Sequence, residues 1–436
     1  MGKGKTMTKP LKIAIAGLGT VGVGVVKLLQ QEGDLLAARC GRPLELIAVS
    51  ARSKDKNRGV DLACAAWVED AKALADTDAD LIIELIGGSE GPAKALVEAA
   101  LAKGKSVITA NKALIAHHGA QLAALAEEHD AQLRFDAAVA GGIPIIDVMQ
   151  HGVSANRFAR VAGILNGTAN YILTTMQKDG RDFDAVLKEA QELGYAEADP
   201  SFDVDGIDTA HKLAILTSLA YGTQPSLEHV SIEGIRSITA RDMHYARELG
   251  YRIKLLGLSE QTEFGIMQRV HPCMMPADAP IARIDGAFNA VQLEGHAVGR
   301  VLLEGQGAGE GPTASSVVSD ILQFARGEPL PAFTLPAGDL MLITAAHLTQ
   351  LTSRYYLRLT VRDEPGVLAE ITAICAREAI SVASLIQHSS SAGEPARIVM
   401  TTHEASEAAM QNALASIAAL DTVIKTPQLI RIQETV

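Results

Sequence analysis

The chain has 436 residues, of which 48% are hydrophobic and only 4% aromatic, and its formal net charge is −12. This length is enough for two or three domains. The negative charge argues against nucleic acid or an anionic membrane as a partner, and no apolar run approaches the ~20 residues of a membrane span. The 4 cysteines contain no CxxC pair. We therefore expect a cytoplasmic protein without a disulfide framework or a zinc site.

The first part of the chain alternates short apolar runs with helical patterns. Strands followed by helices in this way are typical of a parallel, doubly wound sheet. The sequence therefore predicts an α/β domain, with strands at 11–17, 44–50, 79–87 and 106–110 and helices at 21–31 and 92–104.

The rest of the chain divides at a stretch rich in proline and glycine. Residues 327–339 read GEPLPAFTLPAGD, which indicates a linker. The residues after the linker predict the order βαββαβ, a ferredoxin-like arrangement. The segment before it mixes strands and helices, with a helix at 207–222 and a glycine-rich turn at 304–322 that continues as a helix. The predicted parts are a flexible tail at 1–10, an α/β domain at 11–135, an α+β domain at 136–326, a linker at 327–352 and a βαββαβ domain at 353–436.

A GxGxxG motif formed by Gly17, Gly19 and Gly22 follows the first strand and opens a helix. This context gives the motif its meaning, because the glycines permit a tight turn and a close approach to a pyrophosphate. The N-terminus of the following helix adds free N–H groups and the positive end of the helix dipole. The motif predicts a Rossmann dinucleotide site, and a glycine-rich turn without a ligand is the alternative.

The end of the second strand bears on the choice of dinucleotide. An NAD site usually places a carboxylate there for the ribose hydroxyls. This strand instead ends at Ser50, Ala51 and Arg52. Arg52 can pair with a 2′-phosphate, which favours NADP over NAD, although a solvated loop arginine would look the same.

Lys112, in the segment TANK at 109–112, follows the strand at 106–110. Ligands of doubly wound sheets bind beyond the carboxyl ends of the strands. A lysine there can contact a phosphate, a carboxylate or a reacting oxygen. The alternative is that Asn111 simply caps a helix and Lys112 lies on its surface.

Residues 197–212, EADPSFDVDGIDTAHK, gather acidic residues before a helix. In an EF-hand loop with Gly206 at position 6, Lys212 would stand where the chelating glutamate belongs, which excludes calcium. Asp208 and Lys212 are four residues apart and share a helix face. Lys212 can act as a proton shuttle while the acids receive a substrate ammonium. Acids that stabilise the helix dipole are an equal alternative on the residues alone.

Six segments, in this order, resemble bacterial homoserine dehydrogenases of the stand-alone type. The C-terminal segment RDEPGVLAEIT (362–372) resembles an ACT domain. The six segments are AGLGTVG (16–22), ITANKALIA (108–116), AAVAGGIPII (137–146), GILNGTANYIL (163–173), LGYAEADPSFDVDGIDTAHKLAIL (193–216) and GAGEGPTASSVVSDI (307–321).

The resemblance implies an enzyme that uses NAD(P)H to reduce L-aspartate 4-semialdehyde reversibly to L-homoserine, within threonine and methionine biosynthesis. It makes Lys212 the proton donor and acceptor at the substrate oxygen, with Asp208 and Lys112 as further catalytic residues. It makes Glu197, Asp203 and Asp208 the substrate-binding acids. A reductase acting on another small aldehyde or hydroxy acid, and a regulatory protein without turnover, are the competing interpretations.

The resemblance also implies contacts to the cofactor and to a monovalent cation, Na⁺ or K⁺. The family often binds the cation with a glutamate and backbone carbonyls, and this chain has the shorter Asp136 at the glutamate position. The implied cofactor contacts are Thr20, Val21, Lys112, Gly194 and Gly307, and the implied cation ligands are Asp136, Val139, Gly141 and Ile143.

For the C-terminal domain, the resemblance implies threonine as a feedback inhibitor. Asp363 and Gly366 precede a helix N-terminus, which is a natural place for an amino-acid carboxylate. The alternative is an ACT domain that only mediates dimerisation, because a fold does not fix a function. A homodimer or homotetramer is expected from the resemblance alone.

Overall fold

The computed structural model describes residues 9–388 and 395–434, so residues 1–8 of the expected flexible tail lie outside the described residues. The chain separates into two compact units, each built from several stretches of sequence. The first takes in the chain up to Gly167 together with Ala210–His229 and Phe288–Ile343. The second takes in Thr168–Thr209, Val230–Ala287 and the chain from Thr344.

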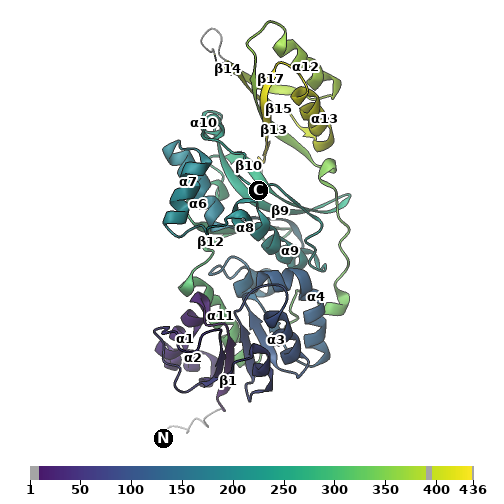
Figure 1. Cartoon of the computed structure of the whole chain (residues 1–436). Helices are drawn as coiled ribbons and strands as arrows, with labels where there is room; N and C mark the ends of the chain where they lie inside the picture. The colour runs from purple at the N-terminus through teal and green to yellow at the C-terminus, as the bar shows by residue number, and fades with distance from the viewer. Residues whose placement is uncertain (1–8, 389–394, 435–436) are drawn as a thin grey trace. The chain divides into compact units, whose positions relative to one another are not determined.

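The first unit contains a six-stranded parallel sheet in the order β3-β2-β1-β4-β5-β6, which confirms the doubly wound α/β prediction. Helices α1, α2 and α11 cover one face and α3 and α4 the other (Figure 1). The elements are β1 (Leu11–Ala16), α1 (Thr20–Gln31), α2 (Gly33–Cys40), β2 (Leu44–Ser50), β3 (Ala66–Trp67), β4 (Leu81–Glu84), α3 (Pro92–Leu101), β5 (Ser106–Thr109), α4 (Lys112–Glu128), β6 (Leu133–Arg134) and α11 (Glu310–Arg326).

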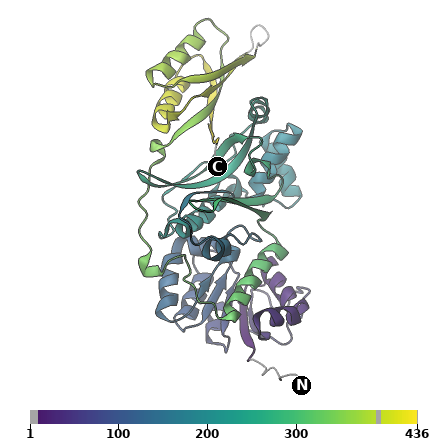
Figure 2. The same cartoon turned by 180° about the vertical axis from the view of Figure 1, so that it is seen from behind.

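The core of this sheet forms because its strands are apolar on both faces, as a sheet covered by helices requires. Every residue of β4 and β5 is buried. Helix α11 comes from nearly 300 residues beyond α1, yet the two helices pack side by side (Figure 2). Val317 and Ile321 of α11 complete the same core as Val25 of α1. At Gly24 of α1 a Cβ would lie 3.0 Å from the Ala314 Cβ, so a glycine permits the close approach of these two helices.

The remainder of the first unit contains an antiparallel ribbon, β7-β11-β12. A compact turn at 136–152 precedes it, and most of helix α9 also belongs to this unit. These elements are η2 (Asp136–Ala138), α5 (Ile145–Asp147), η3 (Val148–Gly152), β7 (Phe158–Ile164), α9 (Ile207–Tyr221), β11 (Phe288–Gly295) and β12 (Gly299–Gln306).

The second unit is built on one mixed sheet, in the order β9-β10-β17-β13-β15-β14. Its C-terminal strands and helices follow the predicted order βαββαβ, with one additional short strand, β16. The elements are α6 (Gly167–Asp179), α7 (Phe183–Glu192), α8 (Ser201–Val204), β8 (Val230–Ile232), α10 (Ala240–Glu248), β9 (Tyr251–Thr262), β10 (Gly265–Pro276), β13 (Thr352–Val361), α12 (Val367–Arg377), β14 (Val382–His388), β15 (Ala396–Thr402), β16 (Ala405–Ser406), α13 (Glu407–Ala418) and β17 (Val423–Ile432).

The stretch 327–352 is irregular, with two single turns, η5 (Ala337–Asp339) and η6 (Leu348–Gln350). It is also packed, because Phe333 is buried with its ring 5.2 Å from that of Phe135. None of the described helices is both long and apolar enough to cross a membrane.

Candidate active site

The loop between β1 and α1 shows why each glycine of the GxGxxG motif is needed. Gly17 has φ +98°, and a Cβ there would lie 2.4 Å from the Leu85 carbonyl oxygen. At Gly22 a Cβ would lie 2.0 Å from the Gly17 carbonyl oxygen. At Gly19, in contrast, a Cβ would meet no protein atom within 4 Å. Packing therefore demands the first and third glycines, and the space above Gly19 suits a pyrophosphate.

Helix α1 offers unused donors to such a ligand. Its N-cap is Gly19, which has no side chain to cap the first turn, and that turn contains no acidic residue. The N–H groups at Thr20 and Val21 belong to the turn that lacks intrahelical partners. Thr20 is exposed and Val21 half-buried, so both can be reached. The arrangement supplies positive charge where a phosphate would lie.

A cavity of about 830 Å³ opens over this loop. It is lined by Gly17 and Gly19, by the loop that follows β4, and by the basic residues Arg52, Lys56 and Arg58 that follow β2. The structure thus brings Arg52 to the same cavity as the glycine motif. Arg52 is exposed, as a residue that meets a ligand from solvent should be.

Arg58 was not singled out from the sequence. Its guanidinium donates hydrogen bonds to the backbone carbonyls of Leu18 (3.3 Å), Lys56 (2.9 Å) and Ser53 (2.5 Å). Its Cζ lies 5.5 Å from the centroid of the Trp67 ring. Arg58 therefore ties the basic loop to the glycine loop. Two arginines in an irregular loop look alike in sequence, and only these contacts distinguish the two roles.

Glu84, at the end of β4, is fully buried and was also missed. One carboxylate oxygen accepts the Thr109 hydroxyl at 2.6 Å, and the other accepts backbone N–H groups of the following loop. Thr109 in turn accepts the N–H of Asn111 at 2.9 Å. A charged residue inside the apolar run LIIELI was the available signal, because such a residue needs fixed partners.

Lys112 begins α4 as a half-buried residue. Asn111 caps this helix, with its side chain accepting the N–H of Leu114 at 3.1 Å and donating to the Gly88 carbonyl at 2.7 Å. The capping role considered for Asn111 is thus present. It does not exclude a functional Lys112, because the cap and the Glu84 network fix where Lys112 leaves the sheet.

Lys212 lies in the second turn of α9 and is buried, with 8% exposure. Its ammonium donates to the Leu165 carbonyl at 2.7 Å. The ring of the neighbouring His211 lies 5.5 Å from that of His117 on α4. Within the first unit, α9 therefore lies beside the helix that begins at Lys112. A lysine buried with its nitrogen oriented is costly, which makes it a candidate for function.

The acids of the stretch 197–212 differ in burial. Glu197 is exposed, Asp203 is half-buried and Asp208, one turn before Lys212, is buried. The exposed Asp199 accepts the N–H of Ser201 at 3.1 Å, and the side-chain and backbone hydrogen bonds from Ser201 lower the pKa of this carboxyl. Asp199 thus has a local turn role, which the sequence left open.

The two other glycines implied as cofactor contacts have different surroundings. Gly194, after α7, has φ +78°, and a Cβ there would meet no protein atom within 4 Å. Gly307 is wedged, because a Cβ would lie 2.0 Å from the Asn289 side chain. Gly307 also leaves no room for a side chain at Gly141, where a Cβ would lie 2.4 Å from the Gly307 carbonyl oxygen. Packing alone therefore explains Gly307, whereas the open space at Gly194 is compatible with a ligand.

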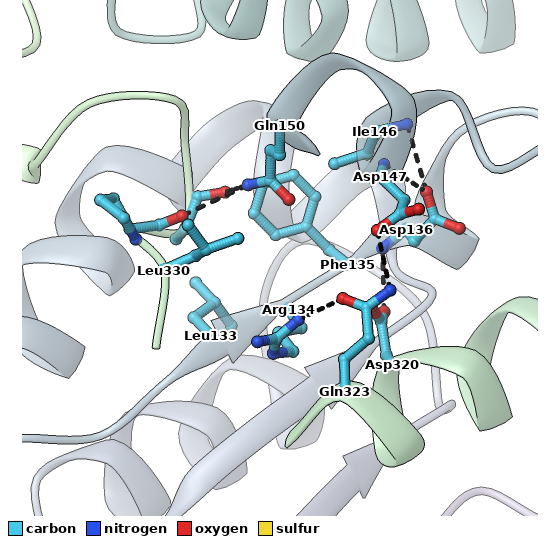
Figure 3. Close-up of a pocket in the computed structure, with 12 residues that line it drawn as sticks. Leu133, Arg134, Phe135, Asp136, Ile146, Asp147, Gln150, Asp320, Gln323 and Leu330 are labelled. Atoms are coloured by element: carbon cyan, nitrogen blue, oxygen red, sulfur yellow. Dashed lines mark hydrogen bonds between the residues drawn. The ribbon is translucent and has the colours of Figure 1, made fainter. Parts of the chain in front are cut away.

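Of the implied cation ligands, Asp136 lines a small pocket together with Arg134, Asp147 and Asp320 (Figure 3), whereas the other three follow η2 in the chain and do not line it. One Asp136 carboxylate oxygen accepts the N–H groups of Ile146 and Asp147, both at 3.2 Å. The Asp136 N–H donates to Asp320 at 3.1 Å. Burial, and then the charge of Asp320, raise the pKa of Asp136 well above its ordinary value, and burial raises that of Asp320 to about 7.

This turn is chemically suited to a hard monovalent cation. A carboxylate and carbonyl oxygens are the appropriate donors, and a cation would offset two crowded buried acids. The Gly141 carbonyl already accepts the Ser316 hydroxyl at 2.7 Å and the Ile143 carbonyl accepts an N–H at 2.7 Å, but each keeps a second lone pair. Ala140 has φ +57°, so the turn between Val139 and Gly141 is held in a strained conformation.

In the C-terminal domain, Gly366 is the N-cap of α12, with φ +98°. A Cβ there would meet no protein atom within 4 Å, so the positive φ alone calls for a glycine. Asp363 is exposed in the loop after β13. The loop leads into a helix N-terminus, as expected from the sequence.

Three family models match this chain. Residues 17–136 match the model described as homoserine dehydrogenase, NAD binding domain. Residues 144–322 match the model described as homoserine dehydrogenase, and residues 355–422 match that of the ACT domain. Homoserine dehydrogenases of Neisseria gonorrhoeae and Pseudomonas aeruginosa are each 42% identical, over 98% of this chain and 99% of theirs.

The chain belongs to the homoserine dehydrogenase family. It is thus an oxidoreductase with a nicotinamide-dinucleotide domain and an ACT domain. A solved homoserine dehydrogenase from Thiobacillus denitrificans superposes with a TM-score of 0.92 at 42% identity, covering 98% of this chain and 99% of that one. A hyperthermophilic archaeal homoserine dehydrogenase in complex with NADPH superposes with a TM-score of 0.63 at 26% identity, covering 74% of this chain and 99% of that one.

Proposed function

We propose that this enzyme interconverts L-aspartate 4-semialdehyde and L-homoserine with NADP(H), as a step in threonine and methionine biosynthesis. One observation carries the proposal within this family: Lys212 is buried in α9, one turn after the buried Asp208, with its ammonium oriented by the Leu165 carbonyl at 2.7 Å. An oriented, partly desolvated ammonium is suited to giving a proton to an aldehyde oxygen that gains negative charge.

The roles proposed for the other residues follow from their chemistry. The nicotinamide supplies the hydride when bound. Lys212 donates the proton to the substrate oxygen in reduction and takes it back in oxidation, and Lys112 stabilises charge beside the cofactor. Glu197, Asp203 and Asp208 hold the substrate ammonium, with Asp208 the most buried of the three. Holding the ammonium of the substrate in one place orients its aldehyde carbon for reduction.

The preference for NADP is supported by the charge of the cavity. Arg52, Lys56 and Arg58 follow β2, where an NAD site usually has a carboxylate. Glu69 and Asp70 line another part of the same cavity. One Asp70 carboxylate oxygen accepts the N–H of Lys72 at 3.0 Å, and its other oxygen, like the Glu69 carboxylate, can still accept from a ribose hydroxyl. NAD therefore remains the weaker cofactor in this proposal.

The cation site is proposed on the donor set of the strained turn. Asp136 would supply a carboxylate, and Val139, Gly141 and Ile143 would supply carbonyl oxygens, to Na⁺ or K⁺. Such an ion would stabilise the turn on which Gly307 packs. It has no part in the chemical step.

For regulation, we propose threonine as an inhibitor that binds at the loop of Asp363 and Gly366, and a homodimer or homotetramer as the assembly. The start of α12 supports the effector site, since a helix N-terminus receives a carboxylate. The division proposed is a Rossmann domain at 11–135, a catalytic domain at 136–326, a linker at 327–352 and an ACT domain at 353–436.

A coupled absorbance assay tests the proposal. NADP⁺ with homoserine should yield NADPH, and NADPH with aspartate 4-semialdehyde should be consumed, each faster than with NAD(H). Threonine added to the full chain should lower both rates, and Asp363→Asn should weaken this inhibition. Turnover of another small hydroxy acid without turnover of homoserine would contradict the proposed substrate. Inhibition that is unchanged in Asp363→Asn would place the effector elsewhere.

A further inference from the structure

The segment 233–236, between β8 and α10, makes two ion pairs that the proposed mechanism does not use. One joins it to the acidic turn before α9, through Arg236 and Asp205. The other joins it to β17 of the C-terminal domain, through Glu233 and Arg431. All of these residues belong to the second unit. The role of Asp205 was open from the sequence.

The backbone of this segment interlocks with the turn. The N–H of Ile235 donates to the Val204 carbonyl at 2.8 Å. At Gly234 a Cβ would lie 2.5 Å from the Val204 carbonyl oxygen and 2.6 Å from the Asp205 Cα. On its other side the N–H of Glu233 donates to a carbonyl of β10 at 2.7 Å. A displacement of the segment therefore has to displace the turn.

Arg236 forms hydrogen bonds with residues at both ends of the short helix α8. Its guanidinium donates to the two Asp205 carboxylate oxygens at 2.5 and 3.1 Å, and to the Ser201 hydroxyl at 3.0 Å. Ser201 begins α8, and Asp205 directly follows it. Bidentate arginine–carboxylate pairs fix orientation as well as distance. Asp203 lies between Ser201 and Asp205 in the chain, and Asp208 follows in the first turn of α9.

Glu233 connects this support to β17. Arg431 donates to both Glu233 carboxylate oxygens, at 2.9 and 2.8 Å. It also donates to both oxygens of Glu407 on α13, at 2.9 and 2.5 Å. Arg431 is only 3% exposed and stands opposite Cys273 in the parallel pairing of β17 with β10. The C-terminal strand thus presents a fixed cation to the segment.

We propose that Arg236 and Asp205 are positioning residues that hold the turn into α9 for substrate binding, and that Glu233 and Arg431 anchor this turn to β17. The inference rests on the substrate-binding roles proposed for Asp203 and Asp208. The pair is half-exposed, beside a cavity of about 300 Å³. An isolated surface pair of this kind would affect stability slightly and leave substrate affinity unchanged.

The test compares kcat and the two KM values in the full-length enzyme and its variants. Asp205→Asn should raise KM for homoserine about five- to tenfold, with KM for NADP⁺ and kcat within about twofold, because only the acidic turn is loosened. Arg236→Lys, which keeps the charge but loses the fork, should give a smaller rise. Asp76→Asn is the matched control, since it removes an exposed carboxylate that pairs with Lys103 elsewhere. The control should change neither constant.

The link to β17 is tested by Glu233→Gln. Arg431 keeps Glu407 in this variant, so no buried charge is left unpaired. KM for homoserine should again rise, by about two- to fivefold, and the double variant with Asp205→Asn should show less than the product of the two effects. The double variant Asp205→Arg with Arg236→Asp, which reverses the charges of this ion pair, should recover part of the affinity for homoserine that Asp205→Asn loses.

Asp208→Asn serves as the reference for the proposed substrate site. If KM for homoserine rises in Asp208→Asn but stays unchanged in both folded Asp205→Asn and Arg236→Lys, the positioning role is wrong and the substrate site stands. If Asp208→Asn also leaves KM unchanged, the proposed substrate site itself fails. Fully multiplicative effects of Glu233→Gln and Asp205→Asn would overturn the connection to β17.

Discussion

Two glycine-containing turns, each leading into a helix, are secured in different ways. The loop before α1 is held by backbone packing, with a Cβ at Gly22 placed 2.0 Å from the Gly17 carbonyl oxygen. The turn before α9 is held by charged side chains that come from distant segments, above all Arg236. The first is fixed by steric exclusion, whereas the second combines backbone packing at Gly234 with the half-exposed ion pair between Arg236 and Asp205. The structure of the loop before α1 should therefore be insensitive to salt but disrupted by a substitution as small as Gly→Ala. The position of the turn before α9 should instead respond to changes in its charged residues.

The largest expected effect is at Lys212, the proposed proton donor, which lies on the helix that follows the second of these turns, α9. Lys212→Ala should lower kcat by about 10²- to 10⁴-fold, because it removes the proposed proton donor. Cofactor affinity, measured by NADPH fluorescence titration, should stay the same, since the substitution leaves the packing of the glycine loop intact. Lys188→Ala on α7, which removes an exposed lysine, is the control. Near-normal turnover in Lys212→Ala would remove its assigned role.

The glycine loop should separate folding from binding. Gly22→Ala should lower the free energy of unfolding by roughly 1–3 kcal/mol or more, because the new Cβ overlaps backbone. Gly19→Ala should unfold at nearly the wild-type denaturant midpoint, but raise KM for NADP⁺ about tenfold by occupying the phosphate space. Equal effects of both variants on stability, with cofactor affinity kept, would mean that the loop is only a turn.

Arg52 tests the charged side of the cofactor cavity. Arg52→Asp should lower the ratio of kcat/KM for NADP⁺ to that for NAD⁺ about tenfold or more, because it replaces the proposed partner of the 2′-phosphate with a like charge. Lys54→Asp is a matched control, since Lys54 is exposed in the same loop but is not among the residues that line the cavity. An unchanged ratio in Arg52→Asp, or an equal change in the control, would contradict the phosphate contact.

The smallest expected effect is on the pH dependence of stability. It comes from a buried acid, Asp320, and not from a half-exposed one such as Asp205 in the turn before α9. Burial raises the pKa of Asp320 from 3.8 to about 7, so the folded state holds a proton that the unfolded chain releases. The resulting stability is present at low pH and is lost as pH rises through about 7. Thermal melts should show this fall, and Asp320→Asn should flatten it.

The same melts test the proposed cation. Replacing choline chloride by KCl or NaCl at constant ionic strength should raise the melting temperature more at pH 8 than at pH 5, because the ion competes with the proton at Asp136. Equal effects at the two pH values would argue against an ion at this turn.

The sequence predicted those features that depend on local chain chemistry. The βαβ order, the glycine motif, the βαββαβ tail and the spacing of Asp208 and Lys212 all reflect periodicity or turn geometry. The family followed from motifs in a fixed order and was confirmed by full-length relatives. Glu84 and Arg58 escaped notice because their function lies in long-range hydrogen bonds.

Tertiary structure alone decided how these local pieces are combined. It placed α11 in the core with α1, although almost 300 residues separate them, because apolar faces pair by shape and not by sequence distance. It gave the acids of one stretch separate partners: Asp199 binds its own turn, whereas Asp205 binds Arg236. Local chemistry sets which residues can ionise or turn the chain, and only the folded backbone determines which charges meet.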